Sequence, residues 1–356
     1  MKKSRRSIFS ILLLAVVFMI SACGGNNANS GTSANTEEPG NSSNSDLSVL
    51  YFVNGTLGDK SFYDSAQAGL DRALKDFGVV VKTIEGGINQ ADWASSLEAA
   101  VSTGDYNAVV LGTSQMADIT KQLATQYPDI QFIFFDDLID TNENIYSMLY
   151  AQSEGAFLAG AFAALTTSST ELSSANADKT IGFIGGMDIP IINDFLSGYK
   201  QGAAYVDPSV EVVASYVGDF SSAPKAKELA LSQINTQKVD IIFNVASGAG
   251  LGTLEGANEK GVYSIGVDSN QNGLYPGSVL TSMLKNVDNT VYRAIDLLIK
   301  GELPASGEVL GMKEDAVGLA KDELYDQHVP QSIKDKMIEI EQKLASGEIK
   351  VESELY

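Results

Sequence analysis

The stretches LSVLYFV (residues 47–53) and SFYDSAQAGLDRALKDF (61–77) set the pattern of the folded chain. The first is an apolar run typical of a buried strand. The second repeats apolar residues at helical spacing, with Ala66, Leu70 and Leu74 on one face. A strand followed by an amphipathic helix is the building unit of a parallel sheet with helices on its faces. These two stretches therefore predict that the folded part of the chain belongs to the α/β class.

The same unit recurs along the chain and restarts once. In the first half we expect strands at 79–84, 108–111 and 131–135 and helices at 91–102 and 117–127. After a break near 145–153, a helix rich in small residues (153–165) opens a second series, with strands at 180–184, 210–217, 239–245 and 262–267 and helices at 191–205, 223–233 and 250–260. The tail adds a strand at 279–283 and helices at 288–300 and 331–344.

This order predicts two doubly wound parallel-sheet lobes that are joined by a hinge. A folded part of about 310 residues is large for one hydrophobic core, which also favours two lobes. We expect the first lobe to comprise residues 47–150 and 271–302, and the second to comprise 151–270 and 303–356. The chain should pass between the lobes near 145–153 and again near 268–272.

The N-terminus reads as the signal peptide of a bacterial lipoprotein. Four basic residues precede a short apolar run at 8–20, which is too short to span a membrane. Ile20-Ser21-Ala22-Cys23 then matches a lipobox, and Cys23 is the only cysteine of the chain. We expect residues 1–22 to be removed and Cys23 to carry the lipid; the alternative is an ordinary signal peptide with a chance cysteine. The Gly/Ser/Asn-rich residues up to 46 should form a flexible tether.

Composition excludes several classes of function. The formal net charge is −21, and an acidic protein of this kind repels nucleic acid. The single cysteine excludes a disulfide framework and a thiolate metal site, and His328 is the only histidine. No metal, cofactor or catalytic constellation is therefore expected, and an enzyme such as a nucleoside hydrolase is disfavoured because no metal-binding run of aspartates is present.

Candidate ligand-binding residues follow the predicted strands, because ligands of open parallel sheets lie beyond the carboxyl ends of the strands. These strand ends carry Asn54-Gly55, Asp136-Asp137, Gly218-Asp219-Phe220, Ser247-Gly248 and Asp268-Ser269. Aromatic rings and carboxylates together suit a flat, hydroxylated, neutral ligand. The alternative is that Asp and Gly stand at strand ends for turn and capping reasons.

Several segments together resemble the basic membrane protein (Bmp) family. They are GDKSFYDSAQAGL (58–70), SEGAFLAGAFAAL (153–165), IGFIGGMDIP (181–190), SYVGDF (215–220), IGVDSNQ (265–271) and LTSMLKNVD (280–288). The family comprises lipoprotein substrate-binding components of ABC importers, with PnrA-like nucleoside-binding members and the type I periplasmic-binding-protein fold. The resemblance spans roughly residues 47–302.

The resemblance implies roles for five residues. Phe62 and Phe220 should sandwich a nucleoside base, and Asp136 should accept hydrogen bonds from base nitrogens. Asp268 should bind the ribose hydroxyls, with Lys285 nearby. A purine should be favoured over a pyrimidine, because it offers the two rings a larger π surface.

The same resemblance implies that Gly248 offers its backbone to the ligand. Two departures from the family pattern lie on the ligand side. Tyr63 stands where the family usually has Asn, and Val53-Asn54-Gly55 replaces a loop that often contains a Thr-Asp pair. Asn54 and Tyr63 are therefore candidate ligand-binding residues that leave room for a sugar as the ligand.

Taken together, we expect a monomeric, lipid-anchored protein on the extracellular face of the cell membrane. Its partners should be a small neutral solute and the permease subunits of an ABC importer. A sugar-binding protein of the same fold, or a ligand sensor that acts on a membrane partner, would share these features.

Overall fold

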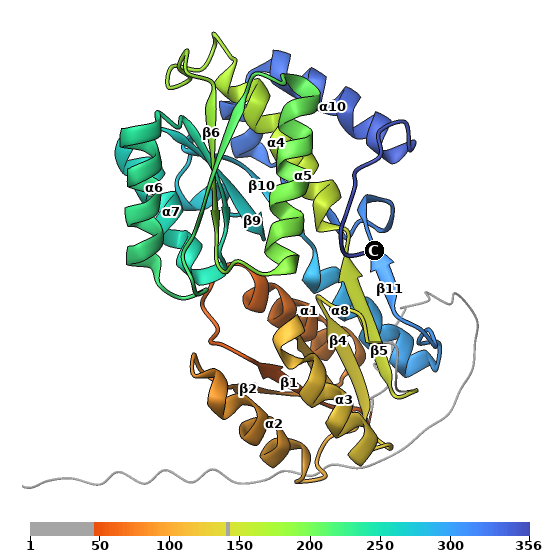
Figure 1. The fold of residues 1–356 in the computed structure, drawn as a ribbon. Helices are drawn as coiled ribbons and strands as arrows, with labels where there is room; N and C mark the ends of the chain where they lie inside the picture. Colours follow the sequence, from red (N-terminus) through yellow and green to blue (C-terminus); the bar gives the residue numbers. More distant parts are fainter. Residues whose placement is uncertain (1–45, 140–142) are drawn as a thin grey trace, which may run out of the picture. The chain divides into compact units, whose positions relative to one another are not determined.

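The computed structural model describes residues 46–139 and 143–356 (Figure 1). The predicted signal peptide, Cys23 and the predicted tether up to residue 45 lie outside the described residues. Within the described ranges, no helix has the length and apolar character that crossing a membrane requires.

The first sheet has the strand order β11-β5-β4-β3-β1-β2, and all its strand pairs are parallel. Its strands are β1 (Ser48–Val53), β2 (Val80–Glu85), β3 (Ala108–Gly112), β4 (Gln131–Phe135), β5 (Ile145–Tyr150) and β11 (Glu308–Leu310). Helices α1 (Phe62–Phe77) and α8 (Val287–Lys300) pack on one face, and α2 (Trp93–Val101) and α3 (Ala117–Gln126) on the other.

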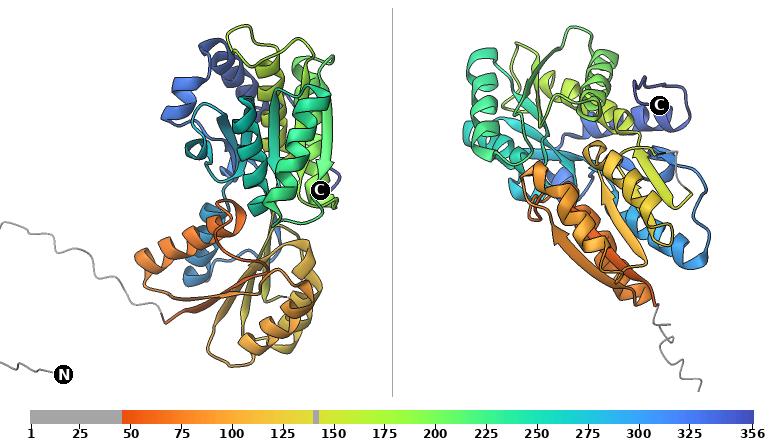
Figure 2. Two further views of the ribbon diagram at one scale, coloured as in Figure 1. Left: turned by 90° about the vertical axis from the view of Figure 1, so that its left-hand side faces the viewer. Right: turned by 60° about the horizontal axis from the view of Figure 1, so that its bottom comes forward.

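The second sheet has the order β12-β10-β9-β8-β6-β7, and only the pairing of β10 with β12 is antiparallel among its described strands. Its strands are β6 (Thr180–Gly185), β7 (Glu211–Tyr216), β8 (Ile241–Val245), β9 (Tyr263–Asp268), β10 (Val279–Lys285) and β12 (Val317–Leu319). Helices α4 (Gln152–Thr167) and α5 (Pro190–Val206) cover one face, and α6 (Ala223–Gln237) and α7 (Ser247–Lys260) the other (Figures 1 and 2). Helices α9 (Glu323–His328) and α10 (Gln331–Ala345) follow β12.

Helices α4 and α5 touch each other along their backbones. A Cβ atom at Gly160 would clash with the carbonyl oxygen of Tyr199, and one at Gly202 would clash with that of Phe157. The small residues of α4, almost all of them buried, make this close approach possible. The predicted helix of small residues is thus the helix on which α5 rests.

Two six-stranded, mostly parallel sheets with helices on both faces confirm the predicted fold class. The first passage between the lobes follows β5, within the predicted range 145–153. The second is wrong: β9 and β10 are neighbours in the second sheet, so no passage occurs near 268–272. The chain instead returns to the first lobe between β10 and α8.

The tail therefore divides differently from the predicted bounds. The sequence assigns 271–302 to the first lobe, but β10 belongs to the second sheet; only α8 returns, and its Tyr292 stacks on Phe77 of α1 with centroids 5.0 Å apart. The sequence assigns 303–356 to the second lobe, but β11 extends the first sheet. A third passage then leads from β11 to β12 through residues 311–316. Strand patterns do not encode which sheet a strand joins, and three-residue strands carry no periodicity.

Candidate ligand-binding site

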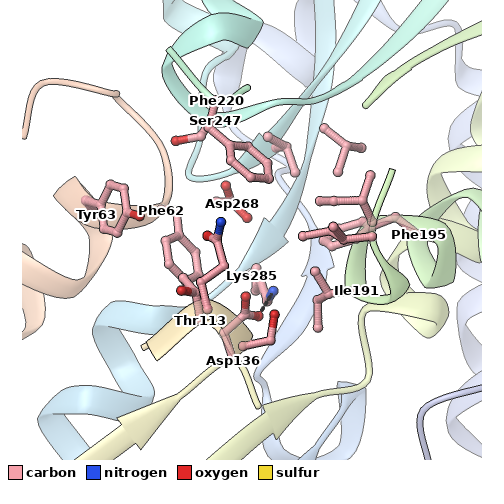
Figure 3. Close-up of a pocket in the computed structure, with 16 residues that line it drawn as sticks. Phe62, Tyr63, Thr113, Asp136, Ile191, Phe195, Phe220, Ser247, Asp268 and Lys285 are labelled. Atoms are coloured by element: carbon pink, nitrogen blue, oxygen red, sulfur yellow. Dashed lines mark hydrogen bonds and ion pairs between the residues drawn. The ribbon is translucent and has the colours of Figure 1, made fainter. Parts of the chain in front are cut away.

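A pocket lies at the carboxyl ends of strands from both sheets (Figure 3). Six of the predicted ligand-binding residues line it: Phe62, Tyr63, Asp136, Phe220, Asp268 and Lys285. The two others, Asn54 and Gly248, line an adjoining pocket that shares Tyr63, Gln115, Phe220 and Ser247 with the first. The structure thus brings residues that are more than two hundred positions apart in the chain to one place.

Four non-glycine residues near the strand ends of this pocket have a positive φ angle. The angle is 74° at Thr113 after β3, 74° at Asp136 after β4 and 62° at Asp268, which ends β9; at Ser247, which follows β8 and opens α7, it is 47°. This region is unfavourable for residues with a Cβ atom, and such strain concentrates at functional sites. The positive φ angle is the local feature that these four pocket residues share.

Lys285 and Asp136 form a buried ion pair in the depth of the pocket. Their side chains are 2% and 9% exposed. The rings of Phe62, Tyr150 and Phe195 surround the ammonium group, with centroids 5.0–5.4 Å from Nζ, so that cation–π attraction adds to the ion pair. Burial raises the pKa of Asp136, and the positive charge of Lys285 opposes this rise. Because the two charges compensate each other, the pair adds no net charge to the pocket.

Asp268 has a different partner. Its Oδ2 accepts a hydrogen bond from Ser61 Oγ at 2.5 Å, and within the described part of the chain no hydrogen bond or ion pair joins it to Lys285. The sequence places Lys285 beside Asp268; the structure pairs it with Asp136. Burial raises the pKa of Asp268 to about 7, although Lys285 lowers it through space. Near neutral pH this carboxyl group can therefore accept a hydrogen bond from a hydroxyl group or donate one to it.

The two predicted stacking rings are held in different ways. Phe62 opens α1, is 8% exposed, and packs on Phe135 with centroids 5.3 Å apart. Phe220 lies in the loop after β7 and is half-buried. Its ring rests on Gly186, where any Cβ atom would clash with the ring. A core contact thus fixes Phe62, whereas a glycine makes room for Phe220.

Tyr63 does not fill the depth of the pocket. Its hydroxyl group donates to the backbone oxygen of Asn54 at 3.0 Å, and its ring lies against Gly55, where a Cβ atom would be 2.7 Å away. Figure 3 shows this ring turned away from Asp268 and Lys285. Tyr63 therefore leaves the space beside those residues open.

Asn54 is buried and only partly satisfied. Its Nδ2 donates to Thr113 Oγ1 at 2.9 Å, whereas its Oδ1 has no partner among the described protein atoms. Gly248 lies where the lobes meet: a Cβ atom there would be 3.4 Å from the carbonyl oxygen of Phe220 and 3.6 Å from Cβ of Asp59. Both residues line the adjoining pocket and not the first one.

Sequence reasoning missed the apolar wall of the pocket. Ile189, Ile191, Ile192 and Phe195, at the start of α5, all line it. They follow β6, so the rule that ligands lie beyond strand ends would have found their loop. Charged and aromatic residues stand out at strand ends, whereas these aliphatic residues resemble an ordinary helix face.

Comparison with protein families gives one match that covers most of the chain. The family model described as "ABC transporter substrate-binding protein PnrA-like" matches residues 47–354. This range contains both sheets and every residue that lines the pocket.

Similar proteins agree in both sequence and structure. Basic membrane protein D of Borreliella burgdorferi (strain JD1) is 30% identical over 311 residues, which are 85% of this chain and 87% of that protein. The CD4+ T-cell-stimulating antigen of Listeria innocua is 28% identical over 99% of both chains. Among solved structures, an ABC transporter solute-binding protein from Aeropyrum pernix K1 matches with a TM-score of 0.77 and 29% identity, covering 85% of this chain and 92% of that one.

Proposed function

Since this chain belongs to the PnrA-like family of ABC transporter substrate-binding proteins, which are not enzymes, we propose that its solute is a purine nucleoside. The protein would bind the nucleoside between its two lobes and deliver it to the permease of an ABC importer. The observation that carries the proposal is one pocket that combines three features. They are two aromatic rings, an ion pair whose charges compensate each other, and a carboxyl group with a pKa of about 7.

The aromatic rings support a base as one part of the ligand. Phe62 comes from the first lobe and Phe220 from the second, and both line the same pocket. Stacking on aromatic side chains is worth about 1–3 kcal/mol per base. Two rings that approach a flat ligand from different lobes favour the larger π surface of a purine.

The buried charges support a neutral, hydroxylated second part. Lys285 is the only basic residue that lines the described pocket, and Asp136 already compensates its charge. A phosphate group would therefore find no uncompensated cation. Asp268 offers a carboxyl group to ribose hydroxyls, and the second oxygen of Asp136 can accept a hydrogen bond from a donor of the ligand, such as a base N–H.

The membrane anchor is part of the same proposal. Acylated Cys23 would hold the protein on the extracellular face of the cell membrane, and residues 24–46 would act as the tether. We expect Cys23→Ala to release the protein from the membrane fraction. Retention in the membrane with the signal peptide cut at the same bond would contradict the lipid anchor.

Calorimetry with guanosine, inosine, adenosine, uridine and ribose tests the ligand class. We expect guanosine and inosine to bind most tightly, and the affinity to change little with salt because no phosphate is held. Tight binding of ribose without any binding of nucleosides would identify a sugar-binding protein of the same fold. A nucleotide ligand with steep salt dependence would contradict the proposal.

A further inference from the structure

A buried carboxylate, that of Asp59, helps to hold the loop that precedes α1. Asp59 is 6% exposed, and its Oδ1 accepts from the backbone N–H groups of Ser61 and Asp64 at 3.0 and 3.1 Å. Its Oδ2 accepts from the N–H of Tyr63 at 3.0 Å. These bonds satisfy free N–H groups at the start of the helix. The loop therefore keeps a fixed shape in the first lobe.

The same loop makes polar contacts with the second lobe. Oδ2 of Asp59 also accepts from Ser247 Oγ at 2.8 Å, at the start of α7. The backbone oxygen of Lys60 accepts from Gln271 Nε2 at 3.0 Å, and that of Ser61 accepts from Ser269 Oγ at 3.1 Å. Each of these bonds joins a residue of the first lobe to a residue of the second lobe.

Ser61 itself reaches a predicted ligand group. Its side chain is completely buried, and its hydroxyl group donates to Oδ2 of Asp268. This bond leaves Oδ1 of Asp268 for a ligand. A residue of the first lobe thus determines how a carboxyl group of the second lobe is oriented.

We propose that Ser61 is a positioning residue that orients Asp268 for the solute, and that Ser61 and the Asp59–Ser247 bond together form an interlobe clasp. The clasp holds the lobes together before the solute arrives; only the part that concerns the solute rests on the proposed function. A hydroxyl group of the solute and Ser61 then share one carboxyl group, so binding is stronger in the closed arrangement and shifts the protein toward it.

Distances between the lobes of the ligand-free protein test the clasp. The full chain with Cys23→Ala receives spin labels at two exposed positions, through Glu98→Cys on α2 and Glu228→Cys on α6. We expect the double variant Ser61→Ala/Ser247→Ala to shift the distance distribution away from that of the parent. An unchanged distribution would overturn the clasp.

The chain offers a matched control in the same helix. Ser65 is buried in the first turn of α1, and its hydroxyl oxygen accepts from the backbone N–H of Asp288 at 3.1 Å, within the first lobe. Ser65→Ala removes a hydroxyl group of the same kind without touching the second lobe. It should leave the distance distribution unchanged; a shift equal to that of the double variant would overturn the assignment to the clasp.

Guanosine serves as the probe for the positioning role. We expect Ser61→Ala to raise the dissociation rate constant about tenfold or more, the effect of losing one hydrogen bond to a charged group, and to change association less. The midpoint of the pH dependence of guanosine affinity should also rise. The hydrogen bond from Ser61 lowers the pKa of Asp268, so its loss raises that pKa, while Lys285, Asp59 and Asp136 still face the carboxyl group. An unchanged rate constant and midpoint would overturn this role. If guanosine does not bind at all, the ligand-free distances still decide on the clasp.

Discussion

Asp136 and Asp268 occupy equivalent places in the two sheets, yet they have different partners. Each stands where a parallel strand ends, each has a left-handed backbone, and each lines the pocket. Asp136 is compensated by Lys285, whereas Asp268 accepts a hydrogen bond from the hydroxyl group of Ser61. The comparison teaches that backbone geometry delivers a carboxyl group to the site, whereas the rest of the fold determines whether its partner is an ammonium or a hydroxyl group.

Removing the partner of Asp136 should have the largest effect. Lys285→Met leaves a buried carboxylate unpaired, which costs about 3–5 kcal/mol in the free energy of unfolding. Chemical denaturation measures this loss. Adding Asp136→Asn should restore part of the stability, whereas a single variant as stable as the parent would show that the pair is not charged.

A surface pair provides the control for that experiment. Lys300 and Asp296 form an exposed ion pair one turn apart on α8. Lys300→Met should leave the stability nearly unchanged, because exposed pairs contribute little.

Substitutions of the two phenylalanines should differ in their effect on stability and agree in their effect on binding. Phe62→Ala should lower stability by about 3–5 kcal/mol, because it empties a core position beside Phe135. Phe220→Ala should lower it far less, because that ring is half-buried. Both variants should weaken the binding of guanosine by about 1–3 kcal/mol in calorimetry. Equal losses of stability would contradict the difference in their packing.

The raised pKa of Asp268 predicts a pH dependence of stability that is of intermediate size. The pKa of Asp268 is about 7 in the folded chain and has its usual value of 3.8 when exposed. Between these values the folded state binds more protons than the unfolded state, so stability falls as the pH rises from about 4 to about 7. Asp268→Asn should remove this part of the slope in denaturation experiments at several pH values. An identical slope in both proteins would assign the pH dependence to other groups.

The smallest effect on stability is expected at Tyr63, which lines both pockets. Tyr63→Phe removes the hydrogen bond to the backbone oxygen of Asn54 and keeps the ring against Gly55. We expect a loss of about 0.5–1.5 kcal/mol in stability and little change in the affinity for guanosine. A strong loss of affinity would show that the hydroxyl group contacts the solute directly.

Much of this site could be predicted because it follows from local rules. Strand ends placed Asp136, Phe220 and Asp268 near one another without any knowledge of the tertiary structure. The partner of Lys285 could not be predicted in this way, because it depends on β10 joining the second sheet while the chain returns to the first lobe immediately afterwards. A local pattern marks a strand, but the neighbour of that strand is decided by the packing of the whole lobe.

The backbone contact between α4 and α5 bears on how such a protein can diversify. Gly160 and Gly202 tolerate no side chain, because a carbonyl oxygen of the opposite helix occupies that space. Around the pocket, by contrast, Gly55 and Gly186 face side chains that can move, those of Tyr63 and Phe220, rather than backbone atoms. Amino-acid substitutions in the loops around the pocket can therefore change which solute is bound. The pair of helices α4 and α5 must keep its two glycines whichever solute the protein binds.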